Sequence, residues 1–325
     1  MKKRPLLFSV GIAAIAGMLF AAFLIWADKN TFTYSNLADE ESKAEAKAIL
    51  RAHHVSQESI DLLFGLAEEY NGVPYDGLVQ SGRKKAVIPF FSYDVKNGFA
   101  HLEAQERGSM INCRSTAFLL LKESLRFAET EIVPDTAFDA DNRYAFAEAD
   151  LEHYALLFGG LDRTHAASSD DLAEKVLAYW EAAGIVFPEG GIHLLMAYAD
   201  MQSGIQNMHT GVVVYADDCV WLLEKIDPIQ PYQIARFKNR EQLIAYMKRN
   251  VAEAEYAAIF SNDTCLWKKK CAAYAPASFS EPTLDKGAAR HARCIPFHNS
   301  PASFFLFRTF TRRKNGKARP LHSVP

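Results

Sequence analysis

Three side chains that lie far apart in the sequence have the types and the order that nucleophilic catalysis needs: Cys113, His209 and Glu224. An imidazole can take the proton of a thiol, and a carboxylate can fix the tautomer of the imidazole and stabilise its protonated form. The resulting thiolate can attack an amide carbonyl and form an acyl-enzyme. We therefore expect Cys113 as nucleophile, His209 as general base and Glu224 as the acid that orients the imidazole.

The residues after Cys113 predict that the thiol lies at the start of a helix. Residues 117–125 are mostly apolar and rich in helix formers. The free N–H groups and the positive end of the dipole at a helix N-terminus stabilise a thiolate. A cysteine taken alone is more often a buried and unreactive side chain. The thiol therefore gains functional meaning only together with the histidine.

The histidine begins the first of two strands that we expect to form an antiparallel hairpin. Residues 209–215 are apolar and rich in β-branched side chains, and residues 219–226 read as a second strand. Residues 217–218 form the turn between them. A two-residue turn pairs Ala216 with Cys219.

This register predicts which acid can reach the imidazole. His209 faces Ile226, and Glu224, two residues earlier, projects from the same sheet face as His209. Asp227 projects from the opposite face and is the reserve for the orienting role. An ordinary solvent-facing charge explains Glu224 equally well, so the sequence leaves both interpretations open.

The remaining pattern predicts an α+β domain with helices packed on an antiparallel sheet. Serine, asparagine and acidic residues before apolar repeats mark helix starts, and glycines mark helix ends. We expect helices at 40–53, 56–70, 150–158, 168–183, 193–198 and 240–249, and further strands at 87–93 and 231–237.

Residues 6–27 form an uncharged, largely apolar run that follows Lys2, Lys3 and Arg4. As a helix this run is long enough for the ~30 Å hydrocarbon core, whereas a cleaved secretory signal has an apolar core of only ~7–15 residues. The positive residues predict that the N-terminus stays in the cytoplasm. We therefore expect residues 1–27 to be a membrane anchor, or alternatively a signal peptide cleaved after Ala27, and the rest of the chain to lie outside the cytoplasm.

Charge is distributed unevenly along the chain. Residues 286–325 hold nine of the 36 basic residues and none of the 39 acidic ones, and residues 5–285 hold 24 basic residues, a net charge of −15. So acidic a body argues against nucleic acid as a partner. The basic tail, residues 268–325, has no periodicity and is expected to be disordered, so the folded domain covers residues 28–267.

The five cysteines are an odd number, so at least one has no disulfide partner within the chain. Cys265 and Cys271 are close enough in sequence to bridge. His291, Cys294 and His298, together with one of these two, have a tolerable spacing for zinc, but they lack a paired C-x-x-C motif and lie in the tail. Motifs of metalloproteases, serine esterases and nucleotide-binding enzymes are missing as well. We expect no metal and no cofactor.

A helix that begins with cysteine, followed by a strand that begins with histidine, resembles the papain-like cysteine hydrolases, especially the bacterial cell-wall hydrolases called NlpC/P60. The segment His209-Thr210-Gly211-Val212-Val213-Val214 is similar to their histidine strand. The resemblance implies a papain-like fold and a cysteine peptidase or amidase that acts on a cell-wall peptide, with Cys113 as nucleophile and His209 as base. In the orienting role these hydrolases usually have His, Asn or Asp, where this chain has Glu224.

Four short motifs between Tyr34 and Trp267 resemble more closely an uncharacterised bacterial family catalogued as domain of unknown function 4300. They are Tyr34-Ser35-Asn36-Leu37, Asn112-Cys113-Arg114, His209-Thr210-Gly211, and Glu224-Lys225-Ile226 followed by Pro231-Tyr232-Gln233. This family implies no activity. Under the hydrolase interpretation, the backbone N–H of Cys113 and the side chain of Asn112 are candidate oxyanion donors. The alternative function is a non-catalytic, membrane-tethered binding or scaffold module of the same fold.

Overall fold

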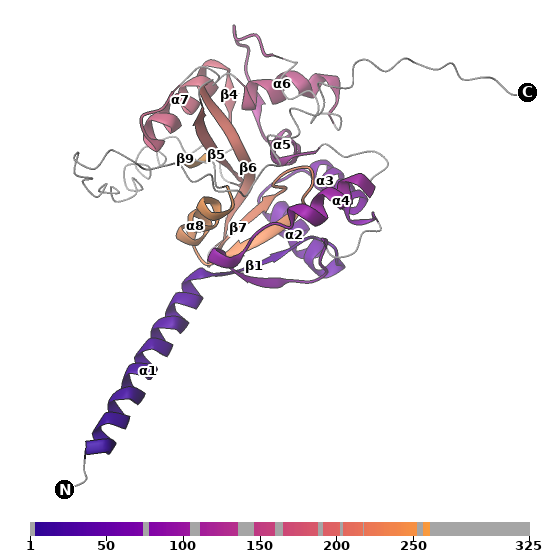
Figure 1. The fold of residues 1–325 in the computed structure, drawn as a ribbon. Coiled ribbons are helices and arrows are strands. Elements are labelled where there is room, and N and C mark those ends of the chain that lie inside the picture. Colours follow the sequence, from indigo (N-terminus) through magenta and orange to yellow (C-terminus); the bar gives the residue numbers. More distant parts are fainter. Residues whose placement is uncertain are drawn as a thin grey trace, which may run out of the picture. The chain divides into compact units, whose positions relative to one another are not determined.

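The computed structural model describes residues 4–73, 78–104, 111–135, 146–159, 165–187, 191–201, 204–216, 218–251 and 256–260. Its helices and antiparallel sheet confirm the expected α+β class (Figure 1). The predicted basic tail, the predicted domain end at residue 267 and the candidate zinc ligands lie outside the described residues.

The larger sheet in the described part of the chain has seven strands in the order β2-β1-β8-β7-β6-β5-β9, and all neighbouring strands run antiparallel. Its strands are β1 (Thr31–Ser35), β2 (Lys84–Val87), β5 (His193–Met201), β6 (Gly204–Ala216), β7 (Cys219–Glu224), β8 (Gln233–Phe237) and β9 (Tyr256–Phe260). Two short strands, β3 (Arg126–Phe127) and β4 (Ile185–Val186), form a separate ladder.

Most helices begin at a residue whose side chain satisfies an otherwise unpaired backbone N–H group. Asp39, Ser56, Asn112, Ser168 and Asn239 each accept a hydrogen bond from the backbone N–H three residues later. The helices after the N-terminal one are α2 (Glu40–Ala52), α3 (Gln57–Asn71), α4 (Val95–Ala104), α5 (Cys113–Leu121), α6 (Glu148–Phe158), α7 (Ser169–Ala182) and α8 (Arg240–Asn250), with the short 3-10 helix η1 at Ile88–Phe90. Five predicted helices, at 40–53, 56–70, 150–158, 168–183 and 240–249, are confirmed.

The β6–β7 hairpin has the predicted register, because Ala216 pairs with Cys219 and the following pairs continue without a shift. β7 ends at Glu224, so β6 continues past the end of its partner in the direction of His209. The hairpin therefore holds these two side chains at one end of the paired region.

Two hydrophobic clusters lie on opposite faces of the sheet. The larger joins α2, α3, α5, α6 and α7 to alternate strand residues such as Val212. The other joins α8 to the intervening strand residues, such as Val213 and Leu222. Side chains alternate along a strand, so His209 has the same orientation as Val213, and Glu224 the same as Leu222. Both therefore project from the face that α8 covers.

Two predicted elements are wrong. Residues 193–198, expected as a helix, form the first part of β5. Their leucine, methionine and alanine favour a helix locally, but the segment pairs with β6 on one side and β9 on the other, and this pairing overrides the local preference. The strand expected at 87–93 ends at Val87, because Pro89 lies in η1 and has no N–H for a ladder.

The N-terminal helix α1 spans Arg4–Asn30, and large apolar side chains between Ile15 and Trp26 are exposed. Its end is tied to α8, since Gln242 Nε2 donates to the Lys29 carbonyl at 2.7 Å. In the described part of the chain, no helix combines the length and the apolar character that crossing a membrane requires.

Candidate active site

Cys113 is the first residue of α5, as predicted, and its side chain is buried. The helix begins here because Asn112 caps it: the Asn112 Oδ1 accepts from the backbone N–H of Ser115 at 3.0 Å. Thr116 Oγ1 donates to the Asn112 carbonyl at 2.8 Å and closes the same turn. α5 is apolar and buried along most of its length and packs against β6, the strand that carries His209.

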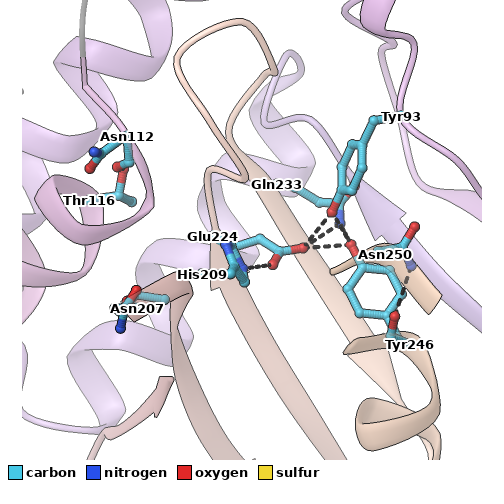
Figure 2. A network of polar contacts seen from close by, with 10 residues as sticks. Tyr93, Asn112, Thr116, Asn207, His209, Glu224, Gln233, Tyr246 and Asn250 are labelled. Carbon is cyan, nitrogen blue, oxygen red and sulfur yellow. Dashed lines mark hydrogen bonds and ion pairs between the residues drawn. The ribbon is translucent and has the colours of Figure 1, made fainter. Parts of the chain in front are cut away.

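His209 and Glu224 form a buried pair across the end of the hairpin. The Nε2 atom of His209 lies 2.6 Å from Oε2 of Glu224, and both side chains are shielded from solvent. Figure 2 shows the imidazole on one carboxylate oxygen and three other side chains around the second oxygen. Of the two acids considered from the sequence, Glu224 is therefore the one that contacts the imidazole.

Cys113 also interacts with this imidazole. Burial, the largest influence, lowers the pKa of His209, but hydrogen bonds with Cys113 and Glu224 and the charge of Glu224 together raise the pKa to about 10. Within the described residues, the His209 Nδ1 makes no hydrogen bond of regular geometry, although the pKa of the ring responds to the neighbouring thiol. Contacts of this kind often tighten only when a substrate binds. The raised pKa keeps the imidazole protonated at neutral pH.

The second oxygen of Glu224 accepts three hydrogen bonds. Tyr246 Oη donates to Oε1 at 2.6 Å, Tyr93 Oη at 3.0 Å and Gln233 Nε2 at 3.1 Å. The two tyrosine hydroxyls also contact each other, and Gln233 Nε2 reaches Tyr246 Oη at 2.9 Å. These hydrogen bonds fix the direction in which the carboxylate points.

Asp227, the reserve candidate for orienting the imidazole, makes its hydrogen bonds elsewhere. Its Oδ1 accepts from the backbone N–H of Ile229 at 2.9 Å, so it supports the loop after β7. Burial raises the pKa of Asp227, while the charges of Lys225 and His209 oppose that rise. Asp227 thus affects His209 through its charge, whereas the hydrogen bond to Nε2 comes from Glu224.

Lys225, the residue that follows Glu224 and the end of β7, is fully buried. Its ammonium lies 3.7 Å from the ring centre of Tyr70 and 4.7 Å from that of Tyr232, and it donates to the Gln230 carbonyl at 2.5 Å. Burial lowers the pKa of Lys225 to about 7, and the charge of Asp227 opposes this shift. Such a buried cation is held by aromatic faces and a carbonyl rather than by a carboxylate.

The structure thus brings Cys113, His209 and Glu224 together and uses Asn112 as a helix cap. Sequence reasoning missed Tyr93 and Tyr246. Tyr93 lies between η1 and α4, and Tyr246 lies on α8, so no local spacing connects either tyrosine to the hairpin. Gln233 ends the motif Pro231-Tyr232-Gln233 quoted above. It is paired directly with Glu224 across β7 and β8, so a predicted register for these two strands would have placed it beside the carboxylate.

The comparisons with known proteins agree with part of this picture. A family described as "Domain of unknown function (DUF4300)" matches residues 33–266. The chain matches no curated protein and no solved structure, and nothing in these comparisons supports a papain-like relationship. The matched range covers most of the chain and includes Cys113, His209 and Glu224. The protein therefore belongs to the DUF4300 family of domains of unknown function.

Proposed function

We propose that this protein is a cysteine peptidase or amidase, with Cys113 as nucleophile, His209 as acid and base, and Glu224 as the orienting carboxylate. The observation that carries the proposal is the buried His209–Glu224 pair at 2.6 Å, whose imidazole also interacts with a thiol at a helix N-terminus. A structural role alone does not explain why three groups from three segments meet in this chemical order.

The raised pKa of His209 points to an imidazolium beside the thiol at the start of α5 before substrate binds. The Cys113 thiolate attacks the amide carbon and forms a C–S bond, while the carbonyl electrons move to oxygen. His209 donates its proton to the amide nitrogen as the C–N bond breaks, so an amine leaves and a thioester remains. His209 then takes a proton from water, whose oxygen attacks the thioester, and cleavage of the C–S bond restores the ion pair.

The N-terminus of α5 supplies a donor for the oxyanion. The first N–H groups of a helix have no partner within the helix, so the backbone N–H of Cys113 is suited to the negative oxygen of the tetrahedral intermediate. The Asn112 Oδ1 is engaged with Ser115. Any help from Asn112 therefore has to come from its amide NH2 group.

The proposed substrate is a peptide of the bacterial cell wall, and the proposed location is outside the cytoplasm. The acidic character of residues 5–285 suits a substrate with free amino groups. The apolar run 6–27 after three basic residues supports an anchor or an export signal. Fractionation of cells that make the full chain tests this: recovery of uncleaved protein in the cytosolic fraction contradicts the proposed location.

A panel of purified cell-wall peptides, incubated with the full-length protein and analysed by mass spectrometry, tests the activity. We expect paired products with a new amino and a new carboxyl end, and none with Cys113→Ser. Cys219→Ser is the matched control, because Cys219 is also a buried thiol but lies at the far end of the hairpin. If no peptide is cleaved and Cys113 is no more reactive than Cys219, the non-catalytic binding module is the better description.

A further inference from the structure

We propose that Tyr93, Gln233 and Tyr246 are positioning residues, which hold the carboxylate of Glu224 aimed at His209. The proposal rests on the proposed function, because it assigns these three side chains a role in presenting a protonated imidazole to Cys113. They act through Glu224 and contact neither the thiol nor the scissile bond.

Proton counting shows how firmly the carboxylate is held. Tyr246 has one phenolic proton and places it on Glu224 at 2.6 Å. Gln233 has two amide protons, one for Glu224 and one for the Tyr246 oxygen. Tyr93 has one proton for two acceptors, Glu224 and Tyr246, so it is shared between them. All four available protons point toward Glu224 or toward the hydroxyl that supports it.

The surroundings make these donors necessary. The ring of Tyr246 packs against Phe32, Phe237 and Phe91, with ring centres 5.1, 5.2 and 5.7 Å away. An ionised carboxylate in such an apolar setting is costly unless hydrogen bonds and an opposite charge compensate it. The three donors on Oε1 and the imidazolium on Oε2 supply that compensation.

The donors also persist over a wide pH range. The pKa values of Tyr93 and Tyr246 are raised well above the usual tyrosine value, first by burial and then by the charge of Glu224. Both phenols therefore keep their protons at neutral and moderately alkaline pH. Asp227 is a further charged group near the pair, because its charge interacts with that of His209.

The three positioning side chains come from separate elements: the segment between η1 and α4, strand β8 and helix α8 (Figure 2). Asn250 Nδ2 donates to the Tyr246 carbonyl at 2.9 Å and ties the last turn of α8. The orientation of His209 thus depends on how α8 docks on the sheet.

The test follows the His209 imidazole by NMR titration of the full-length protein, with Tyr246→Phe and Tyr93→Phe as variants. Each variant keeps the ring and removes one hydroxyl. We expect the acid dissociation constant of His209 to rise by up to about tenfold in each variant, because a carboxylate that is aimed less firmly weakens the Nε2–Oε2 hydrogen bond that stabilises the imidazolium. Tyr198→Phe is the matched control, because it removes a buried hydroxyl that contacts Met196 Sδ instead.

The alkylation rate of Cys113 as a function of pH is the second readout. We expect its midpoint to shift in the two tyrosine variants and to stay unchanged in Tyr198→Phe. An unchanged His209 titration in folded Tyr93→Phe, the variant with the less buried ring, overturns the positioning role even if the wild type cleaves peptides. An unreactive Cys113 in a wild type whose His209 titration does respond to Tyr93→Phe overturns the hydrolase and leaves the network in place.

Discussion

Gly211 lies directly under Leu222 across the β6–β7 hairpin: a Cβ atom at Gly211 would be 2.6 Å from Leu222 Cδ1 and 3.5 Å from the Glu224 Cβ. Leu222 is fully buried and has little room to move. The missing side chain therefore leaves room for the Leu222 side chain between His209 and Glu224, where β6 and β7 hold the buried pair.

Gly211→Ala should destabilise the fold by about 1–3 kcal/mol, because the new methyl overpacks the core at Leu222. Urea unfolding measures the change. Leu222→Val shortens the opposing side chain, so the double variant should cost less than the sum of the two single variants. Strict additivity would show that the two positions do not compete for the same space.

Glu224→Gln should remove most of the pH dependence that the buried pair contributes. The folded pKa of His209, about 10, exceeds its ordinary value of 6.5. The pair therefore contributes its full stability below pH 6.5 and loses it as the pH rises toward 10. In Glu224→Gln this decline should become shallower in unfolding curves measured between pH 6.5 and 9. An identical decline in both proteins contradicts the assignment of the raised pKa to this pair.

Lys225→Met should change the pH dependence in the opposite sense. The pKa of Lys225 is about 7 in the folded protein and 10.5 in its ordinary state, so the wild type gains stability as the pH rises between these values. The stability of Lys225→Met minus that of the wild type should therefore fall by about 2–3 kcal/mol between pH 7 and pH 9. The exposed Lys96→Met is the control, and a difference that does not vary with pH rules the explanation out.

Asn112→Ala should cost about 1 kcal/mol in unfolding free energy, because α5 loses its cap on the Ser115 N–H. Asn112→Ser keeps a capping oxygen and should stay within a few tenths of the wild type. Peptide cleavage separates the two proposed roles of Asn112. If Asn112→Ser is stable but cleaves more slowly, the amide group assists the oxyanion; equal rates assign that task to the backbone.

Local patterns predicted the parts of the fold whose signals lie close together in the sequence. Side-chain caps such as Ser56 and Asn239 marked helix starts correctly, and the turn before Cys219 fixed the hairpin register. The segment that begins at His193 was misread, because its residues are helix formers that a central strand position outweighs. A central strand position depends on the neighbouring strands β6 and β9, which lie far from His193 in the sequence.

The same limit applies to the site. Glu224 was predicted as the partner of His209 because both side chains project from the same face of the predicted hairpin. The 2.6 Å distance between His209 Nε2 and Glu224 Oε2 agrees with that reasoning. Tyr93 and Tyr246 reach Glu224 only because α8 and the segment after η1 pack over one face of the sheet. Long-range packing of this kind leaves no fixed spacing in the sequence.

The activation of Cys113 by His209 is tested by the rate at which iodoacetamide alkylates Cys113 in the full-length protein between pH 5 and pH 9, resolved by peptide mass spectrometry. We expect rapid labelling at pH 6 that is lost in His209→Ala, while Cys219, whose thiol pKa is raised by burial, reacts slowly in both proteins. Labelling of Cys113 that is as slow as that of Cys219, or that is unchanged in His209→Ala, would contradict an activated cysteine–histidine pair.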